Sequence, residues 1–121
     1  MGLDNGITFK CREINNGEKL EVAYWRKCWS IRNTILWYVF WEEYKSDANI
    51  YEFKINATKM NEIIKICEEF SGKNWSEEYW TWEEYRKSHK KNIKEMKKTL
   101  RILKKLEEKG IGYECIFYDS Y

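Results

Sequence analysis

The sequence predicts an α+β fold, in which a small, mainly antiparallel sheet packs against about three helices, the last of them long and basic. Three observations carry this prediction. Alternating apolar and polar residues stand near both ends of the chain, an apolar helical stretch follows the first of them, and apolar residues at helical spacing run through the last third. A chain of 121 residues has the size of one domain with its own core, so residues 1–121 are expected to form a single domain.

The N-terminal segment predicts a β-hairpin. Residues 7–12 alternate apolar and polar side chains, as a half-buried strand does. The Asn15–Gly17 stretch then supplies residues that accept positive φ in a turn. The returning strand is expected to place Leu20, Val22 and Tyr24 on its buried face.

A helix rich in apolar and aromatic residues is expected after Trp25, because the spacing of apolar residues changes there. Its apolar residues cover nearly the whole circumference, so it should be central in the domain or covered by a partner. The helix is expected to end within Ser46–Asn49, and Ile50–Ile55 then suggests a short strand. The main stripe of this helix consists of Cys28, Ile31, Ile35 and Val39.

Two more helices and a last strand complete the predicted order. Asn56 is a suitable N-cap for a helix that carries apolar residues over Met60–Phe70 and ends at Gly72. A further helix is expected from Ser76 to Lys109, ended by the glycines that follow. Residues 113–120 alternate again and predict the closing strand.

The long helix carries an apolar seam whose positions step alternately by three and four. Such a seam packs against another helix or a sheet. Together with the aromatic helix before it, the seam leads us to expect a homo-oligomer. Its eight positions are Trp82, Arg86, His89, Ile93, Met96, Leu100, Leu103 and Glu107.

Charge is distributed unevenly along the chain. The segment Arg86–Lys109 holds eleven cations and three acids, a net charge of +8, so the remaining residues carry −6 of the total of +2. Like charges four residues apart repel one another, so this helix is either a solvated face or a surface that holds a polyanion. The ridge expected to contact a polyanionic partner consists of Lys90, Lys94, Lys97, Arg101 and Lys104.

The sequence gives little support for an enzyme, a cofactor or a metal site. The four cysteines include no C-x-x-C pair, and His89 is the only histidine. The chain contains no glycine-rich phosphate loop and no hydrolase or metalloprotease motif. The histidine falls on the helix seam, where a buried imidazole is more common than a catalytic base. We therefore expect a protein that binds rather than catalyses, with buried thiols typical of a reducing compartment.

The stretch EVAYWRK, Glu21–Lys27, combines flat rings with cations at the junction between the second strand and the first helix. Aromatic rings stack on bases and an Arg forms a fork for phosphate, so the stretch suits a small anionic, nucleotide-like ligand. The alternative is that the two rings fill the strand-to-helix junction. The candidate ligand-binding residues are Tyr24, Trp25, Arg26, Lys27 and Arg32.

Four blocks of this sequence resemble a family of small phage and prophage proteins. They are the opening MGLDNGI, EVAYWRKCWSI, INATKMNEIIKICEE and the closing YECIFYDSY. Members of that family begin with MGLD, carry an E-V-A-Y-W-R-K type core and end in an aromatic strand. Where the family commonly has a histidine after the core, this chain has Arg32. The resemblance implies a phage accessory protein that acts in the cytoplasm of the bacterial host.

Three hypotheses about function follow. The first is a non-enzymatic anti-defence protein that sequesters a nucleotide-like ligand. The second is a protein inhibitor that blocks a host nuclease or CRISPR-type defence complex through the basic helix, by mimicking or competing with nucleic-acid contacts. The partner is then a host defence protein or nucleic acid. The third is a structural or packaging-associated phage protein. No segment has the length and hydropathy of a membrane span, so no membrane partner is expected.

Overall fold

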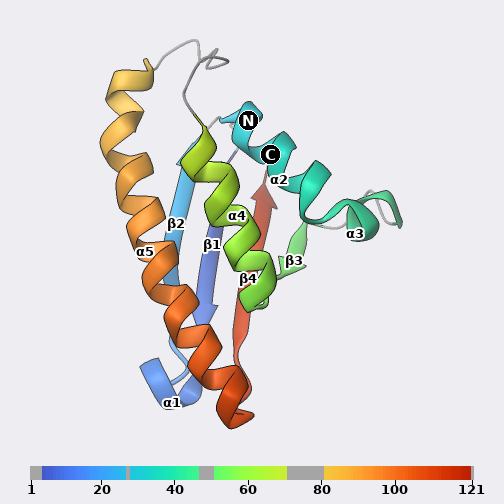
Figure 1. Cartoon of the computed structure of the whole chain (residues 1–121), viewed down its shortest axis with the longest axis vertical. Helices are drawn as coiled ribbons and strands as arrows, with labels where there is room; N and C mark the ends of the chain where they lie inside the picture. The colour runs from blue at the N-terminus through green and yellow to red at the C-terminus, as the bar shows by residue number, and fades with distance from the viewer. Residues whose placement is uncertain (1–3, 27, 47–50, 71–80, 121) are drawn as a thin grey trace.

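The computed structural model describes residues 4–26, 28–46, 51–70 and 81–120 of the chain. It confirms the α+β fold: a four-stranded antiparallel sheet has the order β2-β1-β4-β3, and helices cover one of its faces (Figure 1). The first and last strands in the sequence are therefore the two inner strands of the sheet. The strands are β1 (Asp4–Lys10), β2 (Leu20–Arg26), β3 (Glu52–Lys54) and β4 (Glu114–Ser120).

The N-terminal hairpin forms, but its connection and register differ from the prediction. A one-turn helix, α1 (Arg12–Asn15), precedes Asn16 and Gly17, which have φ angles of 56° and 78°. A β-bulge between Ile7 and Thr8 shifts the pairing with β2. The bulge reverses the alternation, so the expectation that Tyr24 is buried is wrong.

The predicted apolar helix is divided into two helices, α2 (Trp29–Tyr38) and α3 (Trp41–Ser46). The division occurs at Phe40, which is fully buried and lies 4.9 Å from Phe53 and 5.6 Å from Phe117 between ring centroids. At this point the Phe40 N–H donates to the Ile35 carbonyl, five residues back, at 3.4 Å, so the regular helical hydrogen-bond pattern is interrupted. The predicted third strand forms as β3, and residues 47–50 lie outside the described residues.

Helix α4 (Ala57–Glu69) begins as predicted. The Asn56 side chain accepts a hydrogen bond from the Lys59 backbone N–H at 2.8 Å, which satisfies one of the free donors of the first turn. The glycine expected to stop this helix, Gly72, lies outside the described residues.

The long helix α5 (Trp82–Lys109) begins with a capping box at Thr81, in which the Thr81 and Glu84 side chains each bind the other's backbone N–H. The predicted start at Ser76 falls outside the described residues. Gly110 ends the helix with a φ angle of 68°, as predicted.

The apolar seam of α5 packs against other elements of the same chain. His89, Met96, Leu100 and Leu103 are buried, and the helix packs against α4 and β2 (Figure 1). The prediction that the seam packs against another helix or a sheet is confirmed. The expected homo-oligomer stays a prediction.

Candidate functional site

Three of the sequence blocks that carry the family resemblance meet at one end of the sheet. In the register of the strands, Asn5 of β1 lies between Trp25 of β2 and Asp119 of β4. Because successive side chains of a strand point to opposite faces, these three side chains point toward the helices. Their neighbours along each strand point to the other face, which is open.

A buried polar cluster lies on the covered face. The Asp119 carboxylate accepts hydrogen bonds from Arg32 Nε at 3.1 Å and Arg32 Nη2 at 2.8 Å, and from Asn5 Nδ2 at 2.6 Å. Arg32 is 8% exposed and Asp119 is 3% exposed. The guanidinium also donates to Asn33, and it lies 5.5 Å from the Trp29 ring centroid. The cluster therefore joins α2 to the two inner strands.

The structure does not bring the predicted ligand-binding residues together. Arg32 is neutralised by Asp119, and Trp25 is 1% exposed and points into the core. Tyr24 and Arg26 lie on the open face, on the other side of β2 from Trp25. Lys27 lies outside the described residues. The alternative interpretation, in which a ring fills the junction, holds for Trp25.

On the open face, tyrosines are paired with carboxylates. The Tyr24 hydroxyl donates to Asp4 at 2.7 Å, and partial burial together with this carboxylate raises the pKa of Tyr24 to about 12. The Tyr118 hydroxyl donates to Glu21 at 3.2 Å across the sheet. A Cβ atom at Gly6 would lie 2.5 Å from the Tyr118 Oη, so only glycine at this position leaves room for the ring over β1.

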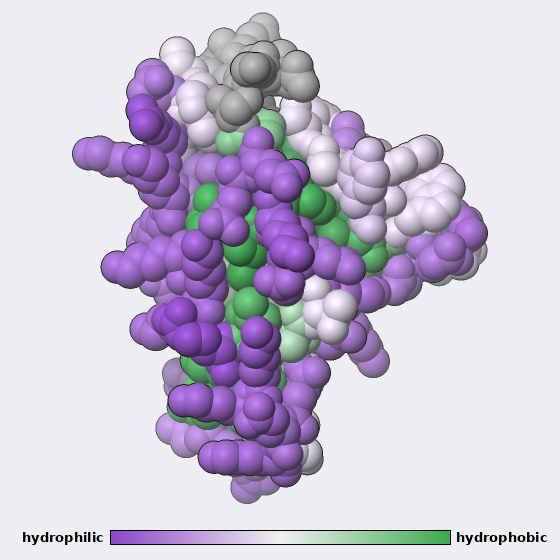
Figure 2. All heavy atoms as spheres, in the orientation of Figure 1, coloured by the Kyte–Doolittle hydropathy of each residue, from purple (hydrophilic) through white to green (hydrophobic). Residues whose placement is uncertain are grey.

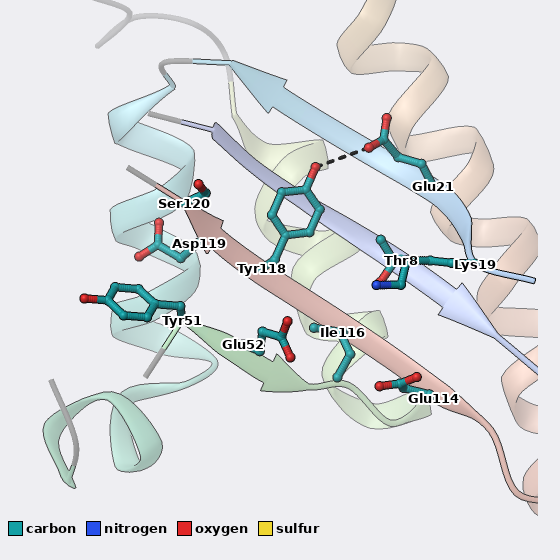
Figure 3. A pocket seen from close by; sticks show the side chains of 10 residues that line it. All are labelled: Thr8, Lys19, Glu21, Tyr51, Glu52, Glu114, Ile116, Tyr118, Asp119 and Ser120. Atoms are coloured by element: carbon teal, nitrogen blue, oxygen red, sulfur yellow. Dashed lines mark hydrogen bonds between the residues drawn. The ribbon is translucent and has the colours of Figure 1, made fainter. Parts of the chain in front are cut away.

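The open face is hollowed beside Tyr118 (Figure 3). The cavity measures about 590 Å³, and its carboxylates come from three strands, while Lys19 is the one cation among its lining residues. This charge balance disfavours an anionic ligand. The lining residues are Thr8, Lys19, Glu21, Tyr51, Glu52, Glu114, Ile116, Tyr118, Asp119 and Ser120.

The predicted ridge on α5 is a continuous surface. Lys90, Lys94, Lys97, Arg101 and Lys104 are all exposed, and Figure 2 shows hydrophilic side chains along the outward face of α5. Among the described residues, two of the eleven cations in Arg86–Lys109 form ion pairs: Lys97 binds Glu68 at 2.9 Å, and Arg86 lies 3.8 Å from Glu83. The exposed cations point away from α4 and β2, because the apolar residues of α5 occupy the opposite side of the helix.

The only histidine has a structural environment. His89 is buried against Phe70 and Trp82, with Nε2 2.9 Å from the Cys67 carbonyl oxygen, and burial lowers its pKa. All four cysteines are buried and free. Within the described ranges, no group of three or more potential ligands could hold a metal ion, and no helix there is long and apolar enough to cross a membrane.

Comparisons with protein-family models, with curated proteins and with solved structures give no match.

Proposed function

We propose that this chain is a non-enzymatic binding protein that holds the phosphate backbone of nucleic acid along the outward face of α5. The observation that carries the proposal is the density of exposed cations along one helix, α5. The eleven cations of Arg86–Lys109 are exposed, and the three acids of this segment stand near its end or beside the ridge.

The dimensions of the ridge suit an extended polyanion. Lys90 and Lys104 are fourteen positions apart on α5, which corresponds to about 21 Å at about 1.5 Å per residue. A duplex presents about one phosphate charge per 1.7 Å of its axis, so several cations would meet phosphates at once. A small ligand would meet only part of this surface.

The ridge favours binding without a preference for base sequence. Lysine forms point-charge contacts with phosphates, whereas base readout requires side chains inserted in a groove. The resemblance to phage proteins supplies the biological part of the proposal: by covering nucleic acid, the protein would deny it to a host nuclease or CRISPR-type defence complex.

The experiment measures binding of a fluorescent DNA duplex and a fluorescent RNA duplex by anisotropy at several salt concentrations. We expect a dissociation constant of about 10⁻⁴–10⁻⁶ M at physiological salt, with an affinity that falls steeply as salt rises. The triple variant Lys90→Gln, Lys94→Gln, Arg101→Gln should bind at least about tenfold more weakly, with a shallower salt dependence.

The matched control removes three cations from elsewhere on the surface, outside α5 and β3, as Lys10→Gln, Lys45→Gln, Lys65→Gln. This variant should bind as the wild type does. Equal losses in both triple variants, or no binding by the wild type at low salt, would exclude the nucleic-acid proposal. Loss of an anti-defence effect in the α5 variant without any nucleic-acid binding would identify an acidic protein surface as the partner instead.

A further inference from the structure

The two edge strands of the sheet, β2 and β3, differ in what pairs with their outer backbone groups. At β2, the Asn92 side chain of α5 donates through Nδ2 to the Tyr24 carbonyl at 2.8 Å and accepts through Oδ1 from the Tyr24 backbone N–H at 3.3 Å. A side-chain amide thus takes the place that a neighbouring strand would have. The other edge strand of the described sheet is β3, whose one strand neighbour is β4.

The backbone orientation of β3 follows from its bonds to β4. The Ile55 N–H donates to the Cys115 carbonyl at 2.8 Å, and the Asp119 N–H donates to the Tyr51 carbonyl at 2.8 Å. In an antiparallel pair, alternate residues direct their N–H and C=O groups to the same side. Residues 51, 53 and 55 therefore face β4, and Glu52 and Lys54 direct their backbone groups outward. Both of these residues are exposed.

The charged side chains of β3 favour one register of pairing with β3 of a second copy. Pairing β3 with β3 of a second copy about a twofold axis allows three registers in which Glu52 or Lys54 sits in a hydrogen-bonded pair. Two of these registers set Glu52 opposite itself or Lys54 opposite itself, and like charges directly opposite destabilise a pair. In the third, Glu52 lies opposite Lys54 at both ends, with four backbone hydrogen bonds available.

We propose that β3 is a homodimer edge, and that a second copy of this chain adds its β3 antiparallel to it with Glu52 opposite the partner's Lys54. Strand addition of this kind takes its affinity from main-chain hydrogen bonds and its specificity from the alternating side chains. Short, charged edge strands usually discourage pairing. Here the two charges are opposite in sign, so on a second copy each of them lies opposite its counterion. Tyr51, which precedes β3, is 56% exposed and supplies aromatic area of the kind enriched in interfaces.

This dimer does not depend on the nucleic-acid proposal. Helix α5 covers the β2 edge of the sheet, and β3 lies at the opposite edge (Figure 1). Pairing at β3 would therefore leave both α5 surfaces exposed, and the two proposals can fail separately.

The test measures molecular mass by sedimentation over a wide concentration range at low salt. Wild type should show a monomer–dimer equilibrium. The single variants Glu52→Lys and Lys54→Glu should each dimerise about tenfold more weakly, because each sets like charges opposite each other. An equimolar mixture of the two single variants should form a heterodimer, because each carries the charge that the other lacks. The double variant Glu52→Lys, Lys54→Glu should dimerise as the wild type does.

The matched control is Glu18→Lys, which changes an exposed acid in the turn before β2 and should leave the equilibrium unchanged. Circular dichroism establishes that each variant is folded. A wild type that stays monomeric at every concentration would overturn the proposal. So would a dimer that both single variants retain, or a mixture of the single variants that remains as dissociated as its components.

Discussion

On each face of the sheet a carboxylate accepts hydrogen bonds from neighbouring side chains, but one face is buried and the other is exposed. On the covered face, Asp119 accepts hydrogen bonds from Arg32 and Asn5, and all three residues are buried. On the open face, Asp4 accepts a hydrogen bond from Tyr24, which is 38% exposed. A carboxylate is the acceptor in both places, and only the access of water differs.

Because water reaches only one of them, the two faces contribute differently to the stability of the fold. A buried charge that loses its partner keeps its desolvation cost, whereas an exposed group that loses its partner returns to water. The covered face therefore holds α2 and the inner strands in one arrangement, and the exposed tyrosine–carboxylate pair of Tyr24 and Asp4 on the open face can be lost at little cost to folding. An exposed surface whose side chains contribute little to stability is one that can evolve to bind a partner.

The largest expected effect is on the covered face. Asp119→Ala leaves the Arg32 guanidinium buried without its carboxylate, so we expect the free energy of unfolding to fall by about 3–5 kcal/mol in urea denaturation. The matched control is Asp4→Ala on the open face, which should cost less than about 1 kcal/mol. Equal losses in the two variants would remove the distinction between the faces.

An intermediate effect is expected from pH. Burial lowers the pKa of His89 in the folded protein, so the unfolded chain takes up a proton first. The stabilisation from the neutral imidazole is complete above the unfolded pKa of about 6.5, and it is lost as the pH falls through that value toward the lower folded pKa.

The histidine effect is isolated by comparing denaturant midpoints at neutral and mildly acidic pH. His89 is the only histidine in the chain, so His89→Gln should lose this part of the pH dependence. A wild type whose midpoint does not change as the pH falls toward 5, or a His89→Gln variant with an unchanged pH profile, would contradict the prediction.

The smallest effect is expected at the open face. Tyr24→Phe removes the hydroxyl that donates to Asp4 and leaves the ring, so the free energy of unfolding should change by about 0.5–1 kcal/mol or less. Thermal and urea unfolding measure this change. A loss as large as that of Asp119→Ala would mean that the open face is structurally as demanding as the covered one.

Elements with local signals were predictable from the sequence. The Asn56 cap, the Gly110 stop and the basic ridge of α5 each follow from residues a few positions apart. The exposure of Tyr24 was not predictable, because one extra residue at the Ile7/Thr8 bulge exchanges the two faces of β2 beyond it.

The candidate site was harder to predict than the fold. Arg32 looks like a free cation in the sequence, and its carboxylate partner lies 87 positions away. The open-face cavity combines residues of strands that are distant in the sequence and adjacent in the sheet. The signal that was present is the polar alternation in β4 and β2, which marks one face of the sheet as exposed.

The position of β4 in the sheet has a consequence for folding during synthesis. β1 lies between β2 and β4, and the Asn5–Asp119 hydrogen bond spans 114 positions of the chain. At a synthesis rate of about 5–20 residues per second, the N-terminal hairpin waits roughly 5–20 s for its inner neighbour. Contacts so distant in sequence also slow folding itself. During that interval the edge of β1 that later pairs with β4 lacks its neighbour, so it can pair with a wrong strand.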